Sequence, residues 1–578
     1  MNSRILYITE YSIVKTWKRR LYSGDCRVPN VEKGETAMTK KIHQGPDRRG
    51  VLAGAAAMGV AFGTGRAWAA SPIVSTRYGK IRGISDGAVQ IFKGVPYGAP
   101  TSGANRFMPP KPPTPWSDVR DATLLGHRAP QTDATGFMEE EVVALDRTAQ
   151  SEDCLCLNIW TPGVGDKKQR PVMVWCHGGG FTGGSGGNIR YDGTELAKKH
   201  DVVLVTLNHR LNAFGFLYLG KLGGEKYADS GNVGMLDIAA ALDWVRGNIA
   251  EFGGDPGNVT IFGQSGGGSK VTTAMAMPQA AGRFHRVIAE SGVELKAITT
   301  DESSEIASRL MTQLGIHDVD QLQQIPFTQI VAALGPMGPA GRFGPVLDHR
   351  ALVAGNGPFD PVAPSISANV PMILGSTLTE ITFLNTTPLD PIDGATLRAD
   401  LKRTLRVEDG EVEKMIALYK SDFPDASNVR LYQIVASDNW LTANVALTAE
   451  RKAAVGKAPA YVYHFEKPTP VHDGKLSVPH TLEVSYVFDN LDGATDDVIT
   501  GTGKDRYPLA DKMSRAWTHF AKTGDPNVSG LPHWRPYSAA DRAVMIFNDQ
   551  CKLLVDPRAE ARQAITELHM RQGQVSRA

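Results

Sequence analysis

The sequence lacks the patterns that mark several classes of protein. In its 578 residues no uninterrupted apolar stretch is long enough to cross a bilayer, so we expect no stable membrane insertion. The body of the chain has no long basic run and no interleaving of aromatic with basic residues, which argues against a nucleic-acid partner. No segment repeats at a fixed period, as it would in a solenoid or a propeller.

Cysteine is also scarce. The five present are Cys26, Cys154, Cys156, Cys176 and Cys551. Cys154 and Cys156 stand two apart on a predicted strand, where they share a face but lie too far apart to bridge without distortion. The spacing fits no zinc pattern. We therefore expect buried free thiols and no metal centre.

What the sequence does contain is typical of a large globular protein. The hydrophobic fraction is 42% and the formal net charge is +1, which excludes a disordered chain and provides ample material for a core.

The N-terminal segment has the features of an export signal. Arg48-Arg49 precede the small, moderately apolar run Val51–Phe62, and Ala67-Trp68-Ala69 follows as an A-x-A cleavage site. This succession resembles a twin-arginine signal, so we expect a periplasmic or secreted protein that is cleaved after Ala69. Met38 is an alternative start, because Met38–Ala69 has the length of a complete signal.

The rest of the chain alternates strands with helices. Residues 73–84 and 90–97 predict an N-terminal antiparallel meander. Later apolar runs predict strands at Leu155–Trp160, Val172–Cys176, Val202–Leu207, Arg286–Glu290, Met372–Gly375 and Ala460–Phe465. Apolar residues of 238–252 recur at spacings of three and four, which predicts an amphipathic helix. This alternation favours a mostly parallel sheet with helices on both faces.

Two long, partly helical insertions interrupt the alternation, near residues 293–369 and 387–457. Insertions of this kind sit at the carboxyl edge of a parallel sheet and would cover the site. The Gly- and Pro-rich part Leu334–Pro345 predicts a loop. We divide the chain into residues 1–69, an extension with the signal, and residues 70–578, one domain with cap insertions.

The stretch Phe252–Gly268, FGGDPGNVTIFGQSGGG, organises the chain. Asp255-Pro256-Gly257 predicts a turn, and Val259–Phe262 predicts a buried strand. A G-x-S-x-G pattern follows, which places Ser265 in a strained bend between a strand and a helix. Such a serine is a candidate nucleophile, and it needs a base because a hydroxyl is weak at its free pKa.

These features together resemble the type-B carboxylesterase family of the α/β-hydrolase fold, which also includes cholinesterases and para-nitrobenzyl esterases. The segments that carry the resemblance are Gln90–Pro100, Ser151–Pro162, His177–Phe181 (HGGGF), Asn208–Leu217, Gly231–Gly268 and His480–Phe488. The resemblance extends from about Ile73 to Phe547.

The order of a catalytic triad in this fold is serine, acid, histidine. Six histidines follow any expected acid, namely His464, His472, His480, His519, His533 and His569. The resemblance implies His480 as the base, with His472 as its rival, because His464 lies inside a predicted strand. It implies Glu380 as the acid, although the flanking Thr379 and Ile381 depart from the family's pattern. Ser291 is a candidate support for the histidine.

The resemblance also implies an oxyanion hole made by the backbone N–H groups of Gly179, Gly180 and Gly266. Glycine there lets the main chain approach a substrate carbonyl. Gln264 stands where many relatives carry glutamate, which argues against a choline-type substrate. The family's disulfide to the position of Cys154 is not expected, because no cysteine lies between Cys26 and Cys154.

We therefore predict a serine carboxylic-ester hydrolase that acts on small to medium ester substrates through an acyl-enzyme, without a metal or organic cofactor. The alternatives are an amidase, lactonase or thioesterase with the same triad, and a non-catalytic, cholinesterase-like binding module.

Overall fold

The computed structural model describes residues 71–132, 146–338, 342–353 and 355–577. These residues belong to one compact unit, Ala69–Ala578. The expected export signal, Met38 and Cys26 lie outside the described residues, and export stays a prediction.

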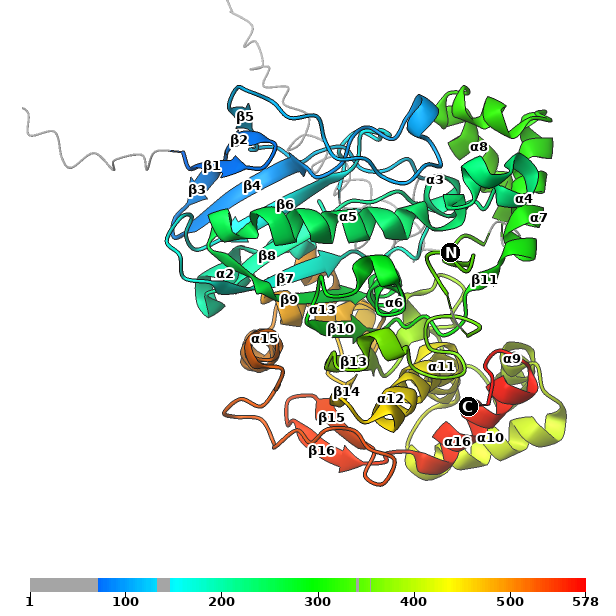
Figure 1. Cartoon of the computed structure of the whole chain (residues 1–578). Helices are drawn as coiled ribbons and strands as arrows, with labels where there is room; N and C mark the ends of the chain where they lie inside the picture. Colours follow the sequence, from blue (N-terminus) through cyan, green and yellow to red (C-terminus); the bar gives the residue numbers. More distant parts are fainter. Residues whose placement is uncertain (1–70, 133–145, 339–341, 354, 578) are drawn as a thin grey trace, which may run out of the picture. The chain divides into compact units, whose positions relative to one another are not determined.

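A large twisted sheet forms the centre of the described chain (Figure 1). Within that part eleven strands pair in the order β16-β15-β14-β13-β10-β9-β7-β8-β6-β4-β3. The seven strands from β15 to β8 pair in parallel, and the strands at both edges pair antiparallel. The predicted fold class, mostly parallel with an antiparallel N-terminal part, is confirmed.

The strand bounds follow the apolar runs of the sequence closely. The strands of the large sheet are β3 (Ile84–Asp86), β4 (Val89–Pro96), β6 (Cys156–Thr161), β7 (Arg170–Cys176), β8 (Val203–Leu207), β9 (Gly254–Gln264), β10 (Arg286–Glu290), β13 (Met372–Thr377), β14 (Ala460–Phe465), β15 (Ala543–Phe547) and β16 (Lys552–Val555). The short strands β1 (Ile73–Thr76), β2 (Gly79–Arg82) and β5 (Arg120–Asp121) form a second sheet, and β11 (Ile298–Thr299) pairs with β12 (Val346–Leu347).

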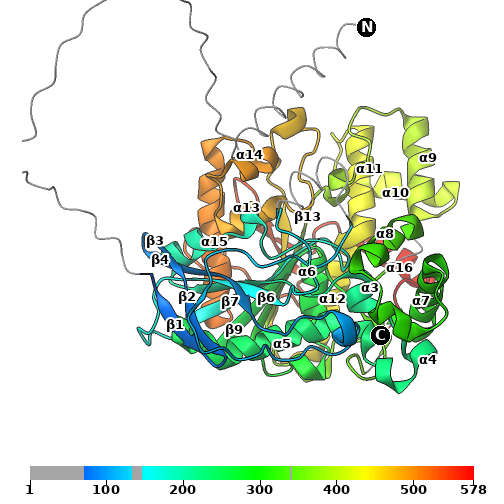
Figure 2. The ribbon, with the colours of Figure 1, turned by 90° about the horizontal axis from the view of Figure 1, so that it is seen from above.

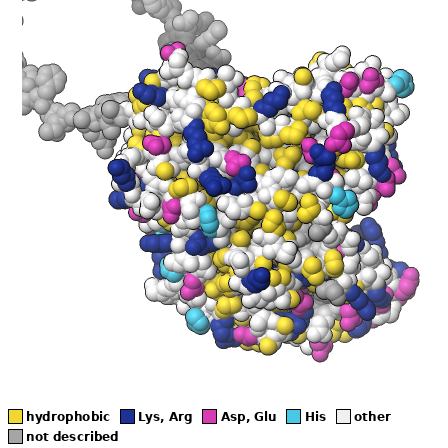
Figure 3. All heavy atoms as spheres, in the orientation of Figure 1, with side chains coloured by type: hydrophobic (Ala, Val, Ile, Leu, Met, Phe, Trp, Pro, Cys, Tyr) yellow, Lys and Arg dark blue, Asp and Glu magenta, His cyan; other side chains and the backbone are white. Residues whose placement is uncertain are grey.

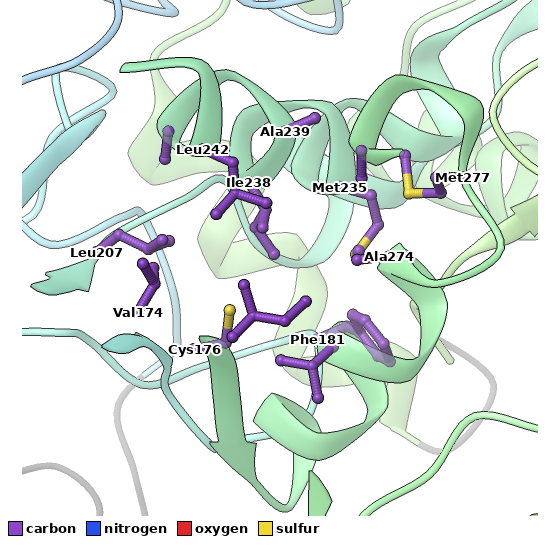
Figure 4. Close-up of a cluster of buried hydrophobic side chains, with 14 of the residues drawn as sticks. Val174, Cys176, Phe181, Leu207, Met235, Ile238, Ala239, Leu242, Ala274 and Met277 are labelled. Atoms are coloured by element: carbon purple, nitrogen blue, oxygen red, sulfur yellow. The ribbon is translucent and has the colours of Figure 1, made fainter. Parts of the chain in front are cut away.

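Alternate residues of each central strand enter two different cores, because successive side chains of a strand point to opposite faces. On β7, Val174 and Cys176 belong to one core, which α5 (Val233–Asn248) and α6 (Gly266–Ala274) cover. Figure 4 shows both side chains facing Ile238 and Leu242 of α5. Trp175 belongs to the opposite core, with α2 (Thr194–His200), α13 (Leu482–Phe488) and α15 (Tyr507–Thr523).

The two insertions contribute most of the remaining helices. The first contains α7 (Thr300–Leu314) and α8 (Phe327–Met337), and the second contains α9 (Gly394–Leu405), α10 (Asp409–Asp422), α11 (Asn428–Ser437) and α12 (Ala443–Val455). Helices α9, α10 and α11 pack together (Figure 2) and share a third core with α16 (Ala559–Arg571). The other helices are α3 (Asn212–Phe216), α4 (Gly220–Gly223) and α14 (Ala494–Thr500).

Two local predictions need correction. β9 begins at Gly254, before the expected turn at Asp255-Pro256-Gly257, but its pairing with β7 skips residues 255–258, where the side chain of Asp255 accepts a hydrogen bond of 2.8 Å from the N–H of Gly257. The expected loop Leu334–Pro345 begins later, because α8 continues to Met337 and takes Pro336 into its last turn.

Two observations concern membrane and surface charge. None of the helices in the described ranges is both long and apolar enough to cross a bilayer. On the face shown in Figure 3, basic and acidic side chains are interspersed and no broad patch carries one sign of charge.

A buried ion pair ties the segment after β8 to α5. The guanidinium of Arg210 donates two hydrogen bonds to Asp237, of 2.8 Å from Nε and 2.6 Å from Nη2, and the backbone N–H of Arg210 adds a third of 3.0 Å. Arg210 and Asp237 are 1% and 0% exposed. Burial raises the pKa of Asp237, and the charge of Arg210 opposes that rise.

We expect Asp237→Ala to lower the free energy of unfolding by about 3–5 kcal/mol, because it leaves a buried guanidinium without its partner. Urea-induced unfolding followed by tryptophan fluorescence measures this loss. Asp243→Ala is the matched control on the same helix: Asp243 pairs with Arg283 at 2.7 Å but is half exposed, and its loss should be at most about 1 kcal/mol. Equal losses for the two variants would contradict the prediction.

Candidate active site

Ser265 lies in the predicted sharp bend between β9 and α6. Its backbone has φ 59° and ψ −126°, a region that a residue with a side chain rarely adopts. The bend is held by a hydrogen bond of 2.8 Å from the N–H of Ser265 to the carbonyl of Glu290 on the neighbouring strand β10. The side chain is partly exposed at the carboxyl edge of the parallel strands.

Glycines make room for this bend. A Cβ atom on Gly292 would lie 1.9 Å from the carbonyl oxygen of Ser265, and one on Gly266 would lie 2.2 Å from the carbonyl oxygen of Gly180. Only glycine fits at these contacts. Gly180 and Gly266, which are 86 positions apart in the sequence, therefore lie against each other beside Ser265.

The three predicted oxyanion glycines have free donors. Gly179 and Gly180 adopt positive φ, 89° and 60°, in the loop after β7, and Gly266 is the first residue of α6. In the described part of the chain no acceptor pairs with the backbone N–H of Gly179, Gly180 or Gly266. The first N–H groups of a helix lack partners within it, so a negatively charged oxygen is favoured there.

His480 and Glu380 meet as the sequence predicts. The Nδ1 atom of His480 lies 2.5 Å from Oε2 of Glu380, and Oε1 of that carboxylate accepts a hydrogen bond of 2.7 Å from the backbone N–H of Thr377. The two side chains are 3% and 0% exposed. A carboxylate at Nδ1 holds the proton on that nitrogen and leaves a lone pair on Nε2.

That lone pair faces the residue before the serine. The side-chain amide nitrogen of Gln264 lies 3.1 Å from Nε2 of His480, while the hydroxyl of Ser265 forms no hydrogen bond with any described residue. The imidazole is therefore directed towards the 264–265 bend, and the amide of Gln264 takes the position at Nε2 that a base would offer to Ser265. Catalytic hydrogen bonds commonly tighten only when a substrate binds.

Thr379, which departs from the family's pattern, connects the two loops that carry Glu380 and His480. Its hydroxyl donates to the carbonyl of Leu476 at 3.1 Å and accepts from the N–H of Val478 at 2.9 Å. The N–H of His480 in turn lies 3.4 Å from the carbonyl of Glu380. Sequence reasoning assigned Thr379 no role, because its contacts are about a hundred residues away.

Two further carboxylates are buried behind this pair. Glu483 accepts a hydrogen bond of 3.0 Å from the hydroxyl of Ser291, and Glu290 accepts one of 2.7 Å from the indole of Trp517. Burial raises the pKa of Glu483 to about 7, with the charge of Glu380 adding to the rise. Ser291 was expected to support the histidine directly; its hydroxyl contacts Glu483 instead, so any influence on His480 passes through that carboxylate.

The rival histidines lie elsewhere. His464 is buried in β14 and its Nδ1 lies 3.0 Å from Glu466, as expected of a structural residue. His472 is exposed in a short turn after β14. Throughout the ranges that the structure describes, no group of three or more His, Cys, Asp or Glu side chains is arranged to hold a metal ion.

A cleft of about 1040 Å³ lies beside the site and is lined mainly by residues of the first insertion, of the α11–α12 junction and of the C-terminal segment. Its lining includes Ser269 on α6, Glu294 after β10, and Trp440. The ring of Trp440 lies 5.2 Å from that of His480, and Phe383 lies 5.5 Å from the same ring. Trp440 stands on a π-helical turn, Asp438–Thr442, between α11 and α12. No sequence pattern predicted that Trp440 would lie beside His480, because the hydrophobic periodicity of the inserted segment does not show which part of the sheet edge it covers.

Comparison with known proteins agrees with this architecture. Residues 70–567 match the model of the carboxylesterase family. The chain is 34% identical over 507 residues to the para-nitrobenzyl esterase of Bacillus subtilis, covering 85% of this chain and 98% of that protein. It is 31% identical over 492 residues to the phenmedipham hydrolase of Pseudarthrobacter oxydans, covering 83% and 95%.

A solved structure shows the same fold. The carboxylesterase of Geobacillus stearothermophilus superposes with a TM-score of 0.74 at 36% identity, covering 85% of this chain and 99% of that one. The chain therefore belongs to the carboxylesterase family, as a type-B hydrolase of carboxylic esters similar to para-nitrobenzyl esterases.

Proposed function

We propose that the protein hydrolyses small to medium carboxylic esters through an acyl-enzyme, with Ser265 as nucleophile, His480 as base and Glu380 as the acid that orients it. The observation that carries the proposal is the placement of His480 between Glu380 and the 264–265 bend, with Nδ1 held by the carboxylate at 2.5 Å and Nε2 directed to the bend. A serine hydrolase requires the acid at Nδ1 and the serine hydroxyl at Nε2; the first contact is present, and the second needs the amide of Gln264 to move off Nε2.

The first half of the reaction forms the acyl-enzyme. The hydrogen bond from the amide of Gln264 to Nε2 of His480 breaks first. His480 then takes the proton of Ser265 while the serine oxygen attacks the ester carbonyl. This attack leaves a negative charge on the former carbonyl oxygen, which accepts hydrogen bonds from the N–H groups of Gly179, Gly180 and Gly266. His480 then gives its proton to the departing alcohol. Glu380 stabilises the charged imidazole without taking its proton.

The second half releases the acid. Water takes the place of the alcohol, and His480 removes a proton from the water. The resulting hydroxide attacks the acyl carbonyl, and the same three N–H groups bind the oxyanion that forms. The tetrahedral intermediate collapses, the bond from the acyl carbon to the oxygen of Ser265 breaks, and Ser265 regains a proton from His480 as the acid leaves. Every step uses side chains and backbone groups of this chain alone.

An aromatic side chain beside the triad supports an ester with an aryl group. Trp440 offers its indole face next to His480, and the same residue lines a cleft of about 1040 Å³, large enough for a molecule of small to medium size. An aryl ester is a suitable first substrate, and the name of the Bacillus subtilis relative records a para-nitrobenzyl ester. Amides, lactones and thioesters are tested beside it, because the same triad serves them.

Ser265→Ala should lower kcat for a para-nitrophenyl ester by about 10⁶-fold, because the nucleophile is removed. Release of para-nitrophenol measures this loss, and circular dichroism checks that the variant is folded. Ser308→Ala is the control: its hydroxyl donates to the carbonyl of Ser304 within α7, away from the triad, and activity should stay within about twofold. Turnover by the Ser265 variant at a rate near that of the natural chain would reject the serine mechanism.

Glu380→Gln should lower kcat by about 10⁴-fold, because an amide favours the tautomer of His480 that carries its proton on Nε2 and cannot accept one there. Glu466→Gln provides a matched control, since Glu466 makes the corresponding contact with His464 outside the site. Full activity in the Glu380 variant, or equal losses in both, would remove Glu380 from the mechanism.

Trp440→Ala should raise KM for an aryl ester about three- to tenfold with little change in kcat, because an aromatic pair contributes about 0.5–1.5 kcal/mol beyond its buried area. An aliphatic ester of similar size is the control and should lose less. A change confined to kcat would mean that Trp440 acts on His480 and not on the substrate.

A further inference from the structure

Lys270 is a fully buried lysine that the mechanism above does not use. It is 0% exposed, on α6, four residues after Gly266 and five after Ser265. Residues four apart on a helix share a face, so Lys270 lies about one turn after Gly266 on the same face of α6. Burying an ammonium group costs several kcal/mol, and a lysine is almost never fully buried without a partner. Its contacts therefore need an explanation.

The side chain reaches the loop that carries the other two oxyanion glycines. Its Nζ atom donates a hydrogen bond of 2.8 Å to the carbonyl of His177, the residue directly before Gly178, Gly179 and Gly180. The ring of Phe181, at the other end of that loop, lies 5.8 Å from Nζ. Lys270 thus lies near both ends of the five-residue loop 177–181 from a single position on α6.

Two other basic side chains, His177 and His209, lie close to Lys270, and burial favours the neutral form of both. The rings of His177 and His209 stack at 5.1 Å, and the Nδ1 atoms lie 2.7 Å from the carbonyls of Gly178 and Arg210. Burial lowers the pKa of both histidines, with the charge of Lys270 adding to the effect. Burial also lowers the pKa of Lys270 to about 7, so charged and neutral forms coexist near neutral pH. Both forms retain an N–H donor for the carbonyl of His177.

We propose that Lys270 is a positioning residue of the oxyanion hole, which holds the loop 177–181 against the start of α6 so that the N–H groups of Gly179 and Gly180 converge with that of Gly266. The inference rests on the function proposed above. The loop has two conformationally free glycines at positive φ, and no strand or helix contains them. The hydrogen bond from Lys270 to the loop fixes the distance from the N–H groups of Gly179 and Gly180 to the N–H group of Gly266.

The test compares Lys270→Met with Lys270→Gln in the full chain. Methionine has a similar length and no donor, whereas glutamine keeps an N–H group near the carbonyl of His177. We expect Lys270→Met to lower kcat for a para-nitrophenyl ester by about 10- to 100-fold, somewhat less than the loss of an oxyanion donor itself, with KM within about threefold. Lys270→Gln should retain most of the activity.

A second measurement isolates the oxyanion. The hydroxyl of Ser265 adds to a trifluoromethyl ketone and gives a tetrahedral oxyanion. The matching methyl ketone has a less electrophilic carbonyl and forms far less of this adduct. The affinity of Lys270→Met for the first should fall by the same factor as kcat, and its affinity for the second should stay within about twofold. Urea-induced unfolding checks that the variant is folded, since the loss of the donor to the carbonyl of His177 and the relief of a buried amine change stability in opposite directions.

Three results would overturn the proposal. In the first, Lys270→Met keeps its kcat and its affinity for the trifluoromethyl ketone. In the second, the Met and Gln variants lose activity equally, so the donor is irrelevant. In the third, both variants lose folded structure, so the role of Lys270 is purely structural. Failure of the proposed function is separate from all three, because it appears as esterase activity that survives in Ser265→Ala.

Discussion

The strained turn at Ser265 exists because glycines on two other segments allow the main chain to come close. A residue held at φ 59° costs about 1–3 kcal/mol, which the surrounding contacts must offset. The bond from Ser265 to the carbonyl of Glu290 and the close approach of Gly292 fix the bend from β10, while Gly180 meets Gly266 from β7. Any side chain at positions 266 or 292 would displace the nucleophile and the oxyanion loop together.

The parallel sheet places the other parts of the site within reach of that turn. Gln264, Glu290 and Gly375 lie in one row across β9, β10 and β13, each near the carboxyl end of its strand. The segments that carry Ser265, Ser291 and Glu380 therefore leave the same edge of the sheet side by side. Segments that are up to 115 positions apart in the sequence thus meet at the carboxyl edge of the parallel strands.

Much of this arrangement was predictable from the sequence. The strands Arg286–Glu290 and Ala460–Phe465 have the predicted bounds, because short apolar runs between polar segments determine buried strands well. The bend at Ser265 and the meeting of Glu380 with His480 also agree with prediction. What could not be foreseen were contacts without a local pattern, such as Gln264 on His480, Lys270 on the loop before Gly179, and Trp440 beside the histidine. Each depends on how distant segments pack, and periodicity carries no information about that.

The π-helical turn Asp438–Thr442 has a geometric consequence for selectivity. One residue more than a regular helix needs is inserted where α11 continues into α12. Deleting that residue would restore a regular helix and change the orientation of Trp440 relative to α11 by about 100°, which moves the indole off the imidazole. The place of this indole beside His480 thus depends on one extra residue in the inserted helices, whereas Ser265 and Glu380 stand on segments that leave the central sheet.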